Sequence, residues 1–63
     1  MTIAEKFKYT RKTLHLTQEK FAMLLGVSFS TVNRLENGHA VPSFSTLESF
    51  NALCKENGIH FDN

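Results

Sequence analysis

Short polar side chains recur with helical spacing in the segment VSFSTVNRLENG, residues 27–38. At about 100° per residue they fall on one side of a helix, opposite Val32 and Leu35. They are Ser30, Asn33, Arg34 and Asn37. An arginine can donate two hydrogen bonds to O6 and N7 of guanine, and an asparagine can pair in the same bidentate way with N6 and N7 of adenine. A solvated helix usually carries Lys and Glu here, so this face is suited to hydrogen bonding with a polar partner.

The helix that carries this face is delimited by a capping residue and a glycine. Ser28 can cap the first free backbone N–H groups, and Gly38 can adopt the left-handed conformation that ends helices. The sequence therefore predicts a helix over about residues 28–37.

Two helices are predicted before it. The first begins at a T-x-x-E capping box, Thr2 and Glu5, and continues to about Thr13. The second follows the cap Thr17, has the sequence QEKFAMLL and ends at Gly26. The apolar residues expected to face the core are Ile3, Phe7, Leu14, Phe21, Ala22 and Leu25.

A fourth helix is predicted after Pro42, which is poorly suited to a helix interior. A second capping box, Ser45 with Glu48, marks its start, and Gly58 marks its end. Its buried face would consist of Leu47, Phe50, Leu53 and Cys54. The tail over residues 58–63 alternates apolar and polar residues, which is typical of a short strand or an extended arm.

The second and third helices are joined by Gly26, Val27 and Ser28 alone. Two helices joined by a short turn that contains glycine form a helix-turn-helix unit. Ala22 is small where the two helices must approach closely, and Gly26 stands where the turn favours a positive φ. We therefore expect one all-α domain over residues 1–63.

The segment LTQEKFAMLLGVSFSTVNRLENG, followed by Pro42, resembles the Cro and phage-repressor family of helix-turn-helix DNA-binding domains, which includes the xenobiotic-response-element-like regulators. The L-T-Q start, the G-V-S turn and the L-E-N-G end carry the resemblance, which extends more loosely from Phe7 to about Gly58. It implies a compact lambda-repressor-like bundle of four or five helices. It also implies binding to the major groove of double-stranded operator DNA, generally as a homodimer.

The resemblance also assigns roles to individual residues, because the second helix of this motif presents its N-terminal residues to base edges. Base contacts are expected from Phe29, Ser30, Asn33 and Arg34, and phosphate contacts from Gln18, Thr31, Asn37 and His39. Phe29 departs from the family pattern, in which polar or basic residues are usual. Its ring could pack on a thymine methyl group or fold over the edge of the domain. His39 stands where a lysine is common.

An ion pair between Arg11 and Glu36 is a further implication of the resemblance. Glu36 lies about 70° from the centre of the apolar stripe, so it can reach a partly buried partner. The alternative is that Arg11 is a solvated cation in a cluster with Lys8 and Lys12.

Length, charge and composition fit these expectations. The 63 residues allow one domain. Residues 1–39 carry six Lys or Arg against three Glu, a charge of +3, and residues 40–63 carry one Lys against three acidic residues, a charge of −2. The basic half thus contains the polar helix, as binding to a polyanion requires. The alternative is that this split is an ordinary charge fluctuation in a small domain. The single Cys54 fits a reducing compartment, and no membrane span or signal peptide is evident. We expect a cytoplasmic protein.

Other functions find little support in the sequence. His15, His39 and His60 are widely spaced and make no recognised zinc motif with Cys54. We therefore expect no metal, no cofactor and no enzymatic activity. The main alternative is a protein-interaction module that binds through Phe29, Phe44 or Phe61.

Several features of such a regulator are left open by the sequence. A dimer could form through the loop near Pro42, the fourth helix or the tail, or the chain could be a fragment whose dimerisation domain lies elsewhere. The operator, the choice between repression and activation, and the biological system are also open. Phage switches, control of restriction, host regulation and antitoxins all fit, and an antitoxin or phage regulator could have a protein partner.

Overall fold

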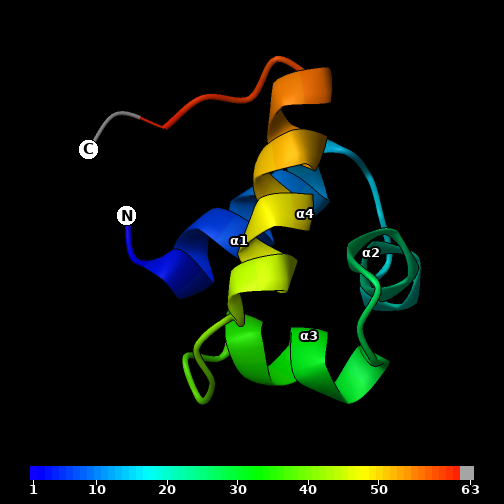
Figure 1. Cartoon of the computed structure of the whole chain (residues 1–63), viewed down its shortest axis with the longest axis vertical. Coiled ribbons are helices and arrows are strands. Elements are labelled where there is room, and N and C mark those ends of the chain that lie inside the picture. The colour runs from blue at the N-terminus through cyan, green and yellow to red at the C-terminus, as the bar shows by residue number, and fades with distance from the viewer. Residues whose placement is uncertain (62–63) are drawn as a thin grey trace.

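The computed structural model describes residues 1–61, and these form four α-helices and no strand (Figure 1). The helices are α1 (Ile3–Thr13), α2 (Gln18–Leu25), α3 (Phe29–Glu36) and α4 (Phe44–Glu56). The predicted all-α class is confirmed. In Figure 1, α4 passes in front of α1, α2 lies beside them, and α3 lies across the lower end of the bundle.

Every helix begins at a Thr or Ser whose side-chain oxygen accepts a hydrogen bond from the backbone N–H three residues later. These caps are Thr2, Thr17, Ser28 and Ser43. At the start of α1 the predicted capping box is complete, because the N–H of Thr2 also donates to the carboxylate of Glu5 at 2.8 Å.

The predicted start of the fourth helix was wrong by two residues. Ser43 is the cap and Ser45 already lies inside α4. Both serines can cap, but Ser43 follows Pro42 directly and has an extended backbone. Its hydroxyl also donates to the hydroxyl of buried Thr46 at 2.9 Å, so the earlier start gives a buried polar group a partner.

Every helix also ends in the same way, with a left-handed residue followed by an N–H that reaches back five positions. The left-handed residues are His15, Gly26, Gly38 and Gly58. The closing bonds are Leu16 to Arg11 (3.0 Å), Val27 to Ala22 (3.0 Å), His39 to Arg34 (2.8 Å) and Ile59 to Cys54 (2.8 Å). This is the Schellman motif, in which glycine usually occupies the left-handed position.

Three phenylalanine rings from α1, α2 and α4 form the centre of the core. The rings of Phe7 and Phe50 stack with centroids 4.0 Å apart, and Phe21 meets both edge-on. The remaining buried apolar residues are Ala22, Leu25, Val32, Leu35 and Cys54. Burial raises the pKa of the Cys54 thiol, which lies 3.7 Å from the hydroxyl of Thr10. The thiol is therefore part of the core, as predicted.

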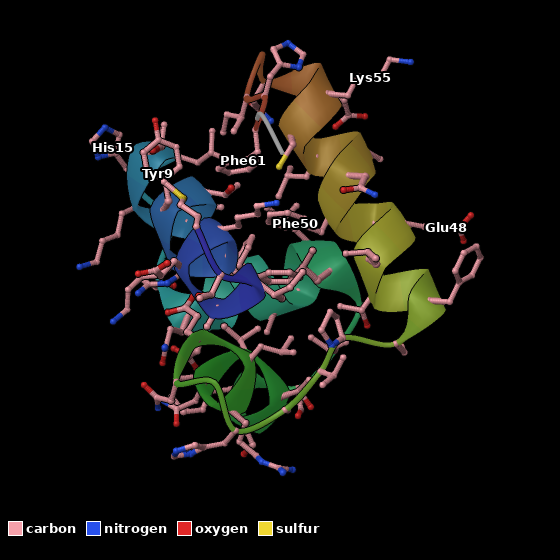
Figure 2. The ribbon with its side chains drawn as sticks, turned by 90° about the vertical axis from the view of Figure 1, so that its left-hand side faces the viewer. Tyr9, His15, Glu48, Phe50, Lys55 and Phe61 are labelled. Carbon is pink, nitrogen blue, oxygen red and sulfur yellow. The ribbon has the colours of Figure 1, made fainter. Side chains whose placement is uncertain are left out.

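The tail folds back over α1 and α4. The ring of Phe61 lies 5.8 Å from that of Tyr9 and 6.4 Å from that of Phe50 (Figure 2). Residues 59–61 are not a strand, so of the two predicted alternatives the strand is excluded for these residues. Their alternation arises because Ile59 and Phe61 pack on the helical core while His60 faces solvent. Residues 62–63 of the predicted tail lie outside the described residues.

Candidate nucleic-acid interface

The helix α3 lies at one end of the bundle, and Figures 1 and 2 both show it at the lower edge of the molecule, so its outward face lies at that end. Ser30 and Arg34 are exposed, whereas Asn33 is half-buried. Val32 and Leu35 occupy the opposite side of the helix and are buried in the core. The helix is therefore fixed by its apolar side and leaves its polar side accessible.

The turn before α3 places the N-terminus of α2 beside this face. Gly26 adopts a φ of 74°, and Ala22 is buried where the two helices meet. A side chain at Gly26 would meet no atom within 4 Å, so the backbone angle is what requires a glycine here. The geometry brings Gln18, the first residue of α2, against α3.

A chain of hydrogen bonds connects α1, α2 and α3 behind this face. The guanidinium of Arg11 donates from Nε and Nη2 to the two carboxylate oxygens of Glu36, at 2.7 and 3.0 Å. Gln18 Nε2 donates to Glu36 Oε1 at 3.1 Å, and Asn33 Nδ2 donates to Gln18 Oε1 at 3.3 Å. Finally, Asn37 Nδ2 donates to Asn33 Oδ1 at 3.2 Å. We call these four linked side chains, Glu36, Gln18, Asn33 and Asn37, the amide relay.

A model of the helix-turn-helix family matches residues 7–58, which is most of the chain. The chain belongs to the helix-turn-helix family of the Cro and repressor type. The lambda-repressor-like fold expected from the sequence is thereby confirmed. No curated protein and no solved structure matches the chain.

Membership makes this helix-turn-helix protein a DNA-binding transcriptional regulator, in a family whose domains are generally non-enzymatic. Within residues 1–61, no helix is long and apolar enough to cross a membrane. The same residues contain no group of three His, Cys, Asp or Glu side chains that could hold a metal ion.

The other residues expected to touch DNA lie around α3. Phe29 is its first residue and is 50% exposed, so its ring is neither buried in the core nor fully in solvent. Thr31 is half-buried, with its hydroxyl 3.0 Å from that of Ser28. His39 is exposed, and its carbonyl accepts a 3.1 Å hydrogen bond from Nη2 of Arg34. That bond uses one of the five N–H groups of the guanidinium and leaves the others available.

The sequence did not indicate that Gln18 also bonds to other side chains within the protein. It assigned Gln18 to a phosphate, but both ends of its amide are hydrogen-bonded within the protein. The bond between Asn33 and Asn37 had a local signal, because residues four apart share a helix face. The bond from Asn33 to Gln18 joins two helices, and no spacing along the chain marks it.

Proposed function

We propose that this helix-turn-helix protein is a cytoplasmic repressor that binds a palindromic operator as a homodimer. The polar outward face of α3 is the observation that supports this most directly. Exposed Ser30 and Arg34 flank Asn33 there, on a helix whose other side is held in the core. In the major groove, Arg34 would donate to O6 and N7 of guanine, and Asn33 would pair with adenine.

The proposal gives Phe29 and Ser30 weaker parts in base reading. A serine hydroxyl bonds with several bases and so specifies weakly. The half-exposed ring of Phe29 can contact a thymine methyl group, because it stands at the N-terminal end of α3.

Contacts to the DNA backbone would come from Gln18, Thr31, Asn37 and His39. Gln18 lies in the first turn of α2, where free backbone N–H groups favour an anion. Its Nε2 donates one N–H to Glu36 and retains a second for a phosphate. Such contacts would fix the register of the protein on DNA and make its affinity fall as salt rises.

The size of the domain supports a dimer. Its backbone measures 26 × 22 × 20 Å, whereas successive half-sites on one face of DNA are about 34 Å apart. One copy therefore covers one half-site. For the contact between copies we favour the loop before α4 together with the first residue of that helix, since Val41 is 89% exposed and Phe44 is 78% exposed. Ile59 and Phe61 in the tail are instead used inside their own domain.

A protein-binding module is the second candidate function, favoured by the exposure of Phe29 and Phe44. A protein-binding function gives no role to the polar face of α3. The DNA-binding proposal gives a role to that face and also to the exposed apolar residues, Phe29 in base contact and Phe44 in the dimer.

Selection from a randomised duplex pool tests the proposal. Wild type and Arg34→Ala would be titrated by fluorescence anisotropy and the retained DNA sequenced. Lys55→Ala is the charge-matched control, because Lys55 lies on α4 at the end of the molecule opposite α3 (Figure 2). We expect a palindromic motif from wild type and Lys55→Ala, and relaxed preference at one symmetric position from Arg34→Ala. Absence of an enriched motif from wild type, even at low salt, would contradict DNA reading and favour the protein-binding module.

A further inference from the structure

We propose that Glu36, acting through Gln18, sets the direction in which the Asn33 amide points and thereby determines the base pair that Asn33 prefers. The inference rests on the proposed function, in which Asn33 contacts a base. Glu36 and Gln18 would then be positioning residues for base readout, acting from behind the surface that meets the base.

The direction is set first at Glu36. Its side chain is 1% exposed and pairs with Arg11, and a carboxylate can only accept hydrogen bonds. Gln18 must therefore turn its NH₂ group toward Glu36, as the 3.1 Å bond from Nε2 to Oε1 shows. This leaves the carbonyl oxygen of the Gln18 amide on the other side.

The orientation of the Gln18 amide then determines that of the Asn33 amide on α3. The Gln18 oxygen can only accept, so Asn33 turns its NH₂ group toward it, at 3.3 Å. The Asn33 oxygen in turn accepts from Asn37 Nδ2 at 3.2 Å. Turning the Gln18 amide by 180° would bring its oxygen against Glu36 Oε1, and turning the Asn33 amide would bring its oxygen against Gln18 Oε1. Each turn would place two acceptors face to face. Every hydrogen bond of the amide relay therefore runs in one direction, from donor to acceptor toward Glu36. That direction is set by the Glu36 carboxylate, because a carboxylate can only accept.

One donor and one acceptor remain on Asn33 for DNA. Its second N–H and its second oxygen lone pair are not used within the relay. Adenine presents N7 as acceptor and N6 as donor, and the order of these groups along the groove distinguishes A·T from T·A. A fixed amide offers its donor and acceptor in one order. An amide free to turn offers both orders and discriminates less.

The obvious test, Glu36→Gln, also breaks the ion pair with Arg11 and therefore changes stability together with the relay. Gln18→Met is the better variant, since it keeps the length of the side chain and removes both of its hydrogen bonds. Lys20→Met is its matched control, with the same new residue on the same helix at an exposed position. Thermal unfolding followed by circular dichroism would verify that each variant is folded.

The experiment measures affinity for the selected operator and for each single-base substitution in it, with Asn33→Ala marking the position that Asn33 reads. We expect wild type and Lys20→Met to prefer one base pair there by about tenfold or more, and Gln18→Met by about threefold or less. Preferences at other positions should be unchanged. Loss of a phosphate contact from Gln18 would weaken binding to all sequences equally, so it cannot imitate this result.

Uniform weakening by Gln18→Met, with every base preference intact, would overturn the relay and leave DNA reading in place. Unchanged preferences in Asn33→Ala would also overturn it, because Asn33 would then read no base. If wild type itself shows no base preference, the proposed function fails, and the relay proposal fails with it.

Discussion

The guanidinium of Arg11 and the carboxylate of Glu36 lie against each other in two parallel hydrogen bonds, although 25 positions separate them in the chain. A third N–H of Arg11 donates to the carbonyl of Leu16 at 3.1 Å. The pair therefore ties α1 to the C-terminal end of α3 and also holds the segment that leads into α2. The exposed fractions of the two side chains are 15% for Arg11 and 1% for Glu36.

This difference in burial predicts unequal effects of breaking the pair. Arg11→Met leaves a buried carboxylate whose one remaining side-chain donor within residues 1–61 is Gln18, and should lower the free energy of unfolding by about 3–5 kcal/mol. Glu36→Gln leaves a neutral amide and an arginine that can reach solvent, so its cost should be smaller, about 1–3 kcal/mol. Urea titrations of both variants would measure this, and equal losses would contradict the argument.

The start of α4 offers a comparison between two serines. Ser43→Ala removes the cap and the bond to Thr46, and should destabilise the protein by about 1 kcal/mol. Ser45→Ala replaces an exposed residue inside the helix with a better helix former, and should be neutral or slightly stabilising. Thermal unfolding of the two variants decides between the caps. A greater loss from Ser45→Ala would restore the start predicted from the sequence.

The end of α1 predicts a stabilising substitution. His15 has a φ of 57°, where a side chain is unfavourable by about 1–2 kcal/mol. His15→Gly should therefore raise the free energy of unfolding by about 1 kcal/mol, since glycine loses part of this gain through its greater freedom in the unfolded chain. A change of this size corresponds to about 4–8 °C in the midpoint of thermal unfolding.

Gly26→Ala is the reciprocal control. It places a side chain at a φ of 74° with nothing within 4 Å, so the backbone alone should make it destabilising. If both substitutions change stability in the same direction, the backbone explanation is wrong.

The capping box of α1 predicts a dependence of stability on pH. The backbone N–H of Thr2 donates to the carboxylate of Glu5 and lowers its pKa from the ordinary value of 4.5. An acid whose pKa is lower in the folded state contributes stability above its unfolded pKa and loses it as the pH falls through the folded pKa. Glu5→Gln keeps an acceptor for Thr2 but does not titrate. Wild type should therefore lose stability relative to Glu5→Gln as the pH falls from neutral to below 4.5, the ordinary pKa of Glu5. A constant difference in melting temperature over that range would contradict the role of Glu5.

The sequence predicted those parts of the fold that are encoded within a few neighbouring residues. Thr2, Thr17 and Gly26 mark helix limits through bonds to residues at most five positions away, so their types and spacing were sufficient. The same logic failed at Ser43 and Ser45, because two equivalent caps lie two residues apart and burial of Thr46 favours the first.

The sequence predicted which residues of the candidate site are exposed, but not the hydrogen bonds between them. Helical periodicity placed Ser30 and Arg34 outside and Val32 inside. The bond of Arg34 to the His39 carbonyl depends on the path of the loop, and that of Asn33 to Gln18 on how α2 crosses α3. Neither leaves a periodic signal.

The uniform closure of the helix ends has a consequence for folding kinetics. Because every cap joins near neighbours, the cap hydrogen bonds can begin to form before the helices have docked. Such local contacts require little loop-closure entropy. Helical domains of this kind fold in microseconds to milliseconds. The contact between Arg11 and Glu36 forms only once α1 and α3 have docked. Its removal should therefore accelerate unfolding more than it slows folding, so the ion pair would govern how long each folded molecule persists.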